Sequence, residues 1–318
     1  MPVQELTVPA MGTTAHLVVV DGSVAALDRA RTRLVELEHR WSRFRPTSEV
    51  SQLNAHAGVP VKVSADTYDL VAHAARAFDV TAGRYDPTVL DAVCNIGYDA
   101  SFEAVRERRK VPSELRIAAP GCASMRLDPR VPAVTLGRGV GFDPGGIGKG
   151  LAADIVVREL RAAGASGAMC NIGGDLALDG TPPDSNGWIV GIEDPMDATT
   201  NVARVTIERG AVCTSSRVRR TWIDANGRRI HHLVDPRNGT PLVTTALTMT
   251  VVAGAAWWAE ACATALFVEG AIGGIPALRD HSLLDDIHVL VIEESGTITT
   301  FGDPGVFDLA SDVSARAS

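Results

Sequence analysis

A glycine-rich stretch at residues 143–150 is the first group whose residue types and spacing could do chemistry. It reads Asp-Pro-Gly-Gly-Ile-Gly-Lys-Gly, and glycines let a backbone approach a ligand closely and adopt positive φ. The run from Leu151 to Leu160 predicts a helix, so the turn lies where free N–H groups attract anions. Lys149 falls in or near the first helical turn, where the dipole disfavours a cation; a nearby phosphate would explain it. The alternative is a tight loop-to-helix turn with a solvated lysine.

Two familiar nucleotide motifs are excluded for this stretch. A Walker A loop needs glycine where Asp143 stands and Ser or Thr where Gly150 stands. A Gly-x-Gly-x-x-Gly fingerprint beginning at Gly146 fails because position 151 is leucine. The chain is therefore neither a P-loop enzyme nor a protein with a Rossmann fingerprint here.

Glu260 and Thr264 form a second candidate group, four residues apart in an otherwise apolar predicted helix over 255–268. This spacing places the carboxylate and the hydroxyl on one helix face. Both are hard oxygen ligands of the kind that Mg²⁺ accepts beside substrate phosphates. The alternative is a glutamate at the edge of a buried helix and a threonine bonded to a backbone carbonyl.

A third group combines His231 and His232 with an Asp-Pro turn at Asp235. On a strand, adjacent histidines point to opposite faces, so a metal site using both is disfavoured. One of them could carry a proton or contact a phosphate; the alternative is a structural histidine. Residues 214–216, Thr-Ser-Ser, show no nucleophile elbow, which argues against a hydrolase triad.

Composition bounds the class of protein. At 318 residues, 46% hydrophobic and 21% charged, the chain is that of a globular protein with ample length for a core. The formal net charge of −8 argues against nucleic acid as a partner. The five cysteines include no C-x-x-C pair, so neither a disulfide framework nor a zinc site is indicated. The given sequence shows neither a signal peptide nor a membrane span, and a cytoplasmic location is expected.

The elements that must position these residues are a mixture of strands and helices. Helices are expected from Ser23 to Trp41 and from Tyr68 to Thr81 with Ser64 as a cap, and a short helix is expected to begin near Thr47. Strands are expected between residues 4 and 20, most clearly over 16–20, and over 134–136, 168–172, 202–207, 211–214 and 248–252, and residues 187–195 are expected to form a strand and a turn. The Asn226-Gly227 pair predicts a hairpin.

This order lacks a regular β-α-β alternation, so the sequence predicts an α+β fold with mixed, largely antiparallel sheets and packed helices. We expect a single domain over residues 1–310 and a disordered, alanine-rich tail at 311–318.

Ordered stretches along most of the chain together resemble the ApbE family, the FAD:protein FMN transferases. They are residues 11–13, 42–54, 81–89, 143–154, 171–175, 188–195, 211–215, 231–241 and 259–266. The resemblance implies a single α+β domain related to T-fold architectures. It also implies an Mg²⁺-dependent enzyme that moves FMN from FAD to a Ser or Thr hydroxyl of an acceptor flavoprotein and releases AMP.

Site residues follow from the resemblance by position. It implies Mg²⁺ bound by Glu260, Thr264 and the backbone carbonyl of Gly146. It implies a catalytic role for Lys149 and for His232, the latter assisting the incoming hydroxyl. The flavin nucleotide would be contacted by Met11, Phe44, Arg84, Tyr85, Asp86, Asp143, Lys149 and Val234.

Several positions depart from the family pattern. The metal carboxylate is commonly Asp, one methylene shorter than Glu260, and Ala263 stands where some members carry a second acid. The acceptor signature, roughly Asp-x-x-Ser/Thr-Gly-Ala-Ser/Thr, is incomplete around Ser166, so self-modification is not expected. Two alternatives stay open: an FAD pyrophosphatase, in which water replaces the acceptor hydroxyl, and a flavin-binding module without turnover.

Overall fold

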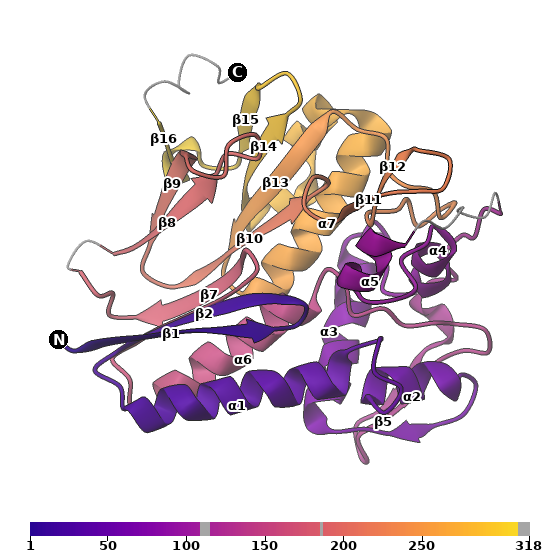
Figure 1. Ribbon diagram of the computed structural model, residues 1–318, viewed down its shortest axis with the longest axis horizontal. Helices are drawn as coiled ribbons and strands as arrows, with labels where there is room; N and C mark the ends of the chain where they lie inside the picture. Colours follow the sequence, from indigo (N-terminus) through magenta and orange to yellow (C-terminus); the bar gives the residue numbers. More distant parts are fainter. Residues whose placement is uncertain (109–114, 185–186, 311–318) are drawn as a thin grey trace. The chain divides into compact units, whose positions relative to one another are not determined.

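The computed structural model describes residues 1–108, 115–184 and 187–310 (Figure 1). Contacts within the chain divide it into two compact units. The first unit contains Met1–Val35, Lys149–Ser216 and the residues from Thr244 onward, and the second contains Glu36–Gly148 and Arg217–Val243. The chain therefore leaves the first unit twice to build the second.

An eight-stranded sheet is the main element of the first unit (Figure 1). Its strands lie in the order in which they occur in the sequence, and each pairs antiparallel with the next. They are β1 (Val3–Ala10), β2 (Thr13–Val20), β6 (Gly167–Ile172), β7 (Asp175–Gly180), β10 (Gly210–Ser216), β13 (Ala246–Ala253), β14 (His288–Glu293) and β15 (Ile298–Phe301).

Strand β13 is covered on both faces. On one face Val252 packs in a cluster with residues of a three-stranded sheet made of β16 (Phe307–Leu309), β9 (Asn201–Ile207) and β8 (Trp188–Glu193). On the other face the Met249 side chain reaches Gly270 of helix α7 (Ala256–Gly273). Because adjacent strand residues point to opposite faces, every residue of β13 is buried, which explains why its sequence is apolar apart from Thr248 and Thr250.

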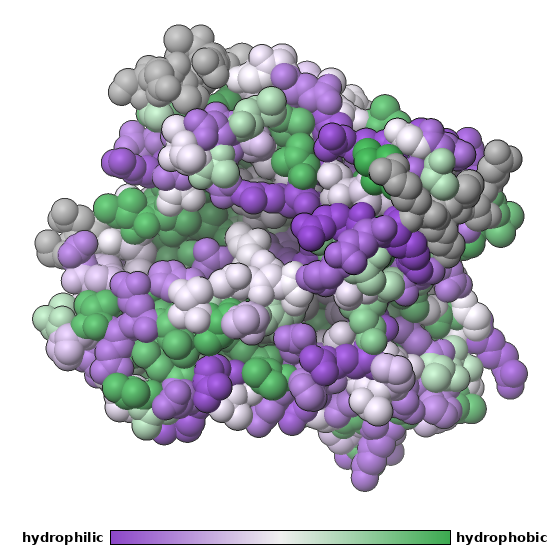
Figure 2. All heavy atoms as spheres, viewed as in Figure 1, coloured by the Kyte–Doolittle hydropathy of each residue, from purple (hydrophilic) through white to green (hydrophobic). Residues whose placement is uncertain are grey.

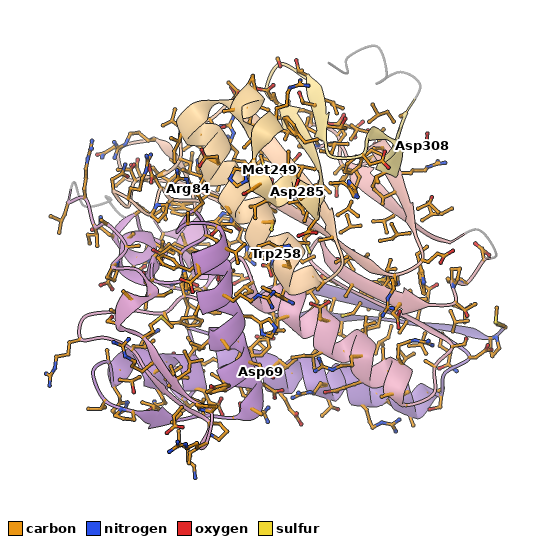
Figure 3. The ribbon with its side chains drawn as sticks, turned by 180° about the vertical axis from the view of Figure 1, so that it is seen from behind. Asp69, Arg84, Met249, Trp258, Asp285 and Asp308 are labelled. Carbon is orange, nitrogen blue, oxygen red and sulfur yellow. The ribbon has the colours of Figure 1, made fainter. Side chains whose placement is uncertain are left out.

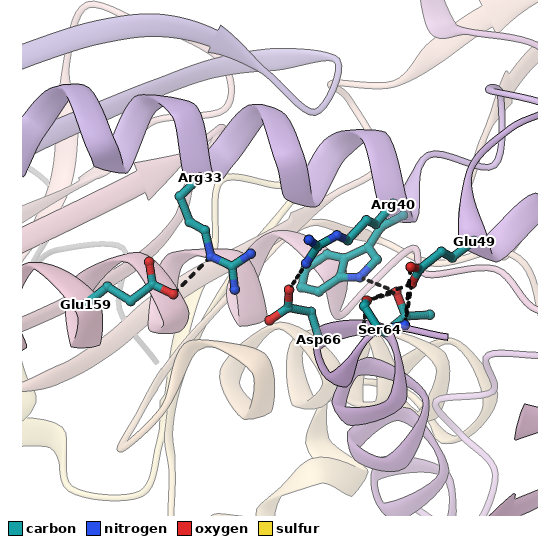
Figure 4. Close-up of polar contacts among 8 residues, drawn as sticks. Arg33, Arg40, Glu49, Ser64, Asp66 and Glu159 are labelled. Atoms are coloured by element: carbon teal, nitrogen blue, oxygen red, sulfur yellow. Dashed lines mark hydrogen bonds and ion pairs between the residues drawn. The ribbon is translucent and has the colours of Figure 1, made fainter. Parts of the chain in front are cut away.

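Three long helices complete the first unit: α7, α6 (Gly148–Ala162) and the beginning of α1 (Val24–Trp41). Helix α7 is apolar nearly all round, as a buried helix must be, and packs on β10 and β13. Helix α1 buries Leu27, Ala30 and Leu34 at helical spacing. It is tied to α6 by Arg33, whose Nε donates to Glu159 Oε1 at 2.9 Å (Figure 4).

The second unit holds shorter elements. Its helices are α2 (Glu49–Ala55), α3 (Ala65–Val80), α4 (Leu90–Asn95) and α5 (Phe102–Glu107). A small sheet joins β3 (Val61–Lys62), β5 (Ala133–Thr135) and β4 (Arg126–Asp128), and β11 (Thr221–Ile223) pairs with β12 (Arg229–His231). Trp222 and Ile230 of this hairpin pack with Val93 and Ile96 of the α4 region in one apolar cluster.

Serine caps fix the starts of α2 and α3. The hydroxyls of Ser48 and Ser64 accept N–H bonds from Ser51 and Thr67 at 3.0 and 3.3 Å, which satisfies backbone donors that the helix leaves free. Glu49 accepts the Ser64 hydroxyl at 2.7 Å (Figure 4). The two caps and this carboxylate contact therefore hold the two helix starts together.

The predicted α+β class with antiparallel sheets is confirmed, including the hairpin around Asn226-Gly227 and the Ser64 cap. Helix α3 begins at Ala65, three residues before the predicted start, because the cap at Ser64 is followed immediately by helical residues. The predicted tail at 311–318 lies outside the described residues.

The surface is mixed in polarity. Figure 2 shows hydrophobic side chains on the face where β8 lies in Figure 1, and on that strand Ile189 is 60% exposed. Among the helices of the described residues, none combines the length and the hydropathy that crossing a membrane requires.

Candidate functional site

The start of α6 carries Lys149 in its first turn, as the sequence predicts. The next residue, Gly150, lies against the first turn of α7: a Cβ built at this position would be 2.3 Å from the Ala256 carbonyl oxygen and 2.9 Å from the Trp257 nitrogen. Real Cβ contacts are never this short, so the two helix backbones meet where only glycine fits. The glycine is thus required by helix packing.

Asp154 of α6 caps α7. Its Oδ1 and Oδ2 accept the backbone N–H groups of Ala256 and Trp257, both at 2.9 Å. The residue before the helix is Ala255, which supplies no side-chain cap, so a carboxylate from another helix performs this role. Figure 3 shows α7 from behind, with Trp258 in its first turns. This contact fixes the start of the helix that carries Glu260.

Glu260 is buried, with 3% of its surface exposed. Its Oε2 accepts the Gly150 backbone N–H at 2.8 Å, and its Oε1 lies 2.6 Å from Lys149 Nζ. A buried carboxylate needs such donors because desolvation of an unpaired charge is costly. The structure therefore brings together Lys149 and Glu260, two residues that the sequence singled out separately.

Asp175 joins this pair. It is the first residue of β7, is 2% exposed, and makes an ion pair with Lys149. The sequence places Asp175 only at the end of a Gly-Gly turn, and nothing local shows that its carboxylate meets Lys149. We name Lys149, Asp175 and Glu260 the carboxylate–lysine cluster.

Hydroxyl groups extend the cluster along α7. Thr264 lies one turn after Glu260, and its Oγ1 is 3.5 Å from the Ser215 Oγ of β10. Carboxylate and hydroxyl oxygens are hard ligands that suit Mg²⁺, so the residues present fit such an ion. Within the described residues, no group of three or more His, Cys, Asp and Glu side chains is placed to hold a metal. A cation here would therefore need hydroxyl or backbone oxygens in addition to carboxylates.

Gly146 belongs to the second unit, two residues before α6 begins, and adopts a φ of 77°. Its backbone carbonyl as a metal ligand stays a prediction from the resemblance.

Met11 is strained. It forms the two-residue turn between β1 and β2 with Gly12, with φ values of 51° and 68°. Positive φ at a residue other than glycine is uncommon, and such strain is concentrated at functional positions. The binding role of Met11 stays a prediction from the resemblance.

Arg43 organises several predicted residues in the second unit. Its guanidinium lies 4.3 Å from the ring centroid of Phe44 and 4.6 Å from that of Tyr98. Its Nε is 3.3 Å from Asp143 Oδ2, with both side chains at most 10% exposed. The Tyr98 ring in turn meets the His232 ring edge-on, with centroids 6.5 Å apart. Phe44, Asp143 and His232 thus share one network through two residues that the sequence did not single out.

The loop after α3 holds Arg84, Tyr85 and Asp86. Tyr85 is 1% exposed, and its backbone N–H donates to Thr81 Oγ1 at 3.1 Å. Asp86 Oδ1 accepts both the backbone N–H and the hydroxyl of Thr88, at 2.8 and 2.6 Å. Burial raises the pKa of the Asp86 carboxyl, although these hydrogen bonds oppose the shift. The following Pro87 accepts the backbone N–H of Asp143 at 2.7 Å, so this loop adjoins the Arg43 network.

His231 and His232, at the end of β12, have different surroundings. His231 Nε2 lies 3.0 Å from the Leu242 carbonyl oxygen, and burial lowers the pKa of this imidazole. His231 is therefore a buried structural side chain, whereas His232 contacts Tyr98 in the Arg43 network. Val234 is 7% exposed and pairs with Pro241. The hydrogen bond from Arg237 lowers the pKa of the neighbouring Asp235 carboxyl.

Comparison with known proteins places these features in a family. A model of the ApbE family matches residues 11–289. An FAD:protein FMN transferase of Haemophilus influenzae is 28% identical over 303 residues, covering 91% of this chain and 86% of the relative. Another, of Klebsiella pneumoniae, is 30% identical and covers 88% and 86%. The crystal structure of the ApbE protein of Thermotoga maritima has a TM-score of 0.83 at 24% identity and covers 99% of both chains.

The relatives in sequence are transferases, which confirms the predicted class of enzyme. The chain belongs to the ApbE family.

Proposed function

We propose that this protein transfers the FMN moiety of FAD to a Ser or Thr hydroxyl of an acceptor protein and releases AMP, with Mg²⁺ as the cofactor. The name of the sequence relatives supports the donor and the transferred group. The carboxylate–lysine cluster is the observation that carries the chemistry, because it combines a partly exposed cation at a helix start with two buried carboxylates. Residues 1–310 form the catalytic domain in this proposal.

The proposed Mg²⁺ ligands are Glu260, Thr264 and the backbone carbonyl of Gly146. When bound, Mg²⁺ would withdraw charge from pyrophosphate oxygens and orient the phosphorus that reacts. The chain's own contribution is to fix the Glu260 carboxylate, which the Gly150 N–H and the Asp154-capped helix hold in place. A ligand fixed in this way needs little rearrangement during the reaction.

Lys149 would stabilise the negative charge that develops on the pyrophosphate. Its side chain is 24% exposed at the start of α6, so a ligand can reach it while it contacts Asp175 and Glu260. In phosphoryl transfer, positioning and charge stabilisation supply most of the catalysis. Met11, Phe44, Arg84, Tyr85, Asp86, Asp143 and Val234 would contact the flavin nucleotide, as the resemblance implies.

His232 would assist the acceptor hydroxyl. In the proposed step the hydroxyl oxygen bonds to the phosphorus of the FMN half, and the bond from this phosphorus to the bridging oxygen breaks. AMP leaves with the bridging oxygen, and His232 takes the hydroxyl proton. The edge-on contact with Tyr98 orients its imidazole.

A mass measurement tests this proposal. The protein is incubated with FAD and Mg²⁺, with and without a domain that carries an acceptor hydroxyl in the family signature. We expect the acceptor to gain the mass of FMN, with one AMP released for each FMN transferred. FMN and AMP formed equally without the acceptor would instead indicate a pyrophosphatase, and unchanged FAD would indicate a binding module.

Two variants test the assigned roles. Glu260→Gln removes the charge that binds the metal and should abolish Mg²⁺-dependent transfer, whereas Glu269→Gln on the same helix should leave it intact. His232→Ala should slow transfer by at least about 100-fold if it acts as the base, with the half-buried His73→Ala as its control. Wild-type rates in either test variant would remove that residue from the mechanism.

A further inference from the structure

The carboxylate–lysine cluster is not electrically balanced. Asp175 and Glu260 are 2% and 3% exposed, and Lys149 pairs with both of them. Two carboxylates and one ammonium group leave one negative charge in excess. Because charges removed from water are costly unless they are compensated, the cluster favours the binding of a further cation.

The two oxygens of Glu260 are not equivalent. The backbone N–H of Gly150 donates to Oε2 at 2.8 Å, whereas Oε1 lies 2.6 Å from the Nζ atom at the end of the flexible Lys149 side chain. A cation that binds Glu260 would lie within a few ångströms of the ammonium group, where like charges repel strongly. A divalent cation and Lys149 therefore compete for this carboxylate.

Asp175 offers Lys149 a second partner. It lies at the start of β7, where ladder pairing with Ile172 and Cys213 fixes its backbone. Its carboxylate contacts Lys149 independently of Glu260. Lys149 can thus be displaced from Glu260 and still be neutralised at the same location.

We propose that Asp175 is a positioning residue that retains Lys149 beside Glu260 when a divalent cation displaces the ammonium group from that carboxylate. The inference rests on the proposed function for the identity of the cation, and adds to it a role for Asp175 and a competition between Lys149 and the metal. After the exchange, Lys149 is free to turn toward an anionic ligand while Asp175 limits how far it moves. In this arrangement Asp175 acts through Lys149 and is not a metal ligand.

Metal binding by the free protein tests this competition without a measurement of activity. Electron paramagnetic resonance follows free Mn²⁺ during titration of the metal-free, flavin-free full chain. Lys149→Met should tighten Mn²⁺ binding at least about fivefold, because the competing ammonium group is gone. Asp175→Asn should weaken binding about tenfold, because Lys149 then has Glu260 as its remaining carboxylate partner in the cluster.

The double variant Lys149→Met/Asp175→Asn is decisive. If Asp175 acts through Lys149, removing both should restore Mn²⁺ affinity to the wild-type level or above. If Asp175 binds the metal directly, the double variant should remain weaker than Lys149→Met by the same tenfold factor. Asp179→Asn changes a partly exposed carboxylate on the same strand and should leave the affinity unchanged.

The outcomes separate clearly. Weaker or unchanged Mn²⁺ binding by Lys149→Met, or no recovery in the double variant, would overturn the proposal. Circular dichroism checks that each variant folds. If Lys149→Met does not fold, the double variant, which keeps the net charge of the cluster, replaces it. A higher Mn²⁺ affinity of the double variant than of Asp175→Asn then supports the proposal, and an equal affinity overturns it. FMN transfer by the wild-type protein would leave the proposed function standing even where this inference fails.

Discussion

Arg43 connects residues that lie far apart in the sequence of the second unit. Its guanidinium contacts the rings of both Phe44 and Tyr98, pairs with Asp143, and donates to the Tyr98 carbonyl oxygen at 2.8 Å. A planar guanidinium can satisfy all of these contacts at once, whereas a lysine ammonium group cannot. The predicted nucleotide contacts Phe44 and Asp143 therefore depend on a residue that is not itself predicted to bind.

Replacing Arg43 should be costly. Arg43→Met leaves the nearly buried Asp143 carboxylate without its ion pair, which should lower the free energy of unfolding by about 3 kcal/mol. Urea unfolding measures this loss. Arg45→Met, in the same loop, removes a pair with Glu38 that is half exposed, and it should cost less than about 1 kcal/mol. Equal losses in the two variants would contradict the role given to Arg43.

His231 should make stability depend on pH. Burial, opposed in part by the hydrogen bond to Leu242, lowers its pKa below the ordinary value of 6.5. The folded state therefore binds its proton at a lower pH than the unfolded state. The contribution of the neutral His231 to the free energy of unfolding is therefore fully present above about pH 6.5. It is lost as the pH falls below this value, by up to about 1.4 kcal/mol per pH unit.

Denaturant unfolding of the wild type and of His231→Gln between pH 5 and pH 8 measures this dependence. Glutamine can donate to the same carbonyl but does not titrate, so the variant should show a flatter profile in the acidic range. His56→Gln, an exposed histidine of the same unit, should keep the wild-type profile. Parallel profiles for the wild type and His231→Gln would refute the assignment.

At the scale of elements, α7 depends on a cap from another helix. Asp154→Ala should cost about 1–2 kcal/mol in unfolding free energy, because two backbone N–H groups lose their acceptor. Hydrogen exchange at the Ala256 and Trp257 amides should accelerate. Asp154→Asn keeps one acceptor, so its exchange rates should lie between those of the wild type and Asp154→Ala. Glu159→Ala removes an exposed ion pair on the same helix and should leave both amides protected. Unchanged exchange in Asp154→Ala would show that the cap is dispensable.

Elements whose signals are local could be predicted from the sequence, and contacts between elements could not. Serine caps, helical spacing and Asn226-Gly227 act within a few residues, so the helices and the hairpin follow from them. Lys149 meets Asp175 and Glu260, which are 26 and 111 residues away in the chain. No local sequence pattern predicts such tertiary contacts. Helical spacing singled out Glu260 and Thr264 and the resemblance implied their role, whereas Asp175, Asp154 and Arg43 became evident only from tertiary contacts.

For the whole molecule, the proposed metal site predicts a cation-dependent stability. A ligand that binds only the folded state, present at 100 times its Kd, stabilises it by about 2.7 kcal/mol. Calorimetry with Mg²⁺ or with a chelator should therefore show a higher Tm with Mg²⁺. Glu260→Gln should lose this difference and Glu269→Gln should keep it. An equal shift in Glu260→Gln would place the cation elsewhere.

The sequence order of the large sheet has a consequence for synthesis on the ribosome. Strands β10 and β13 are direct neighbours, with Ser216 opposite Thr248, although residues 217–245 lie between them in the chain. The growing chain can therefore pair β1, β2, β6, β7 and β10 before the hairpin β11–β12 has emerged. The second unit gains its last segment only with Val243, and Glu260 follows later still. A nascent chain arrested before α7 would hold most of its sheet and Lys149, yet neither Glu260 nor the helix that Asp154 caps.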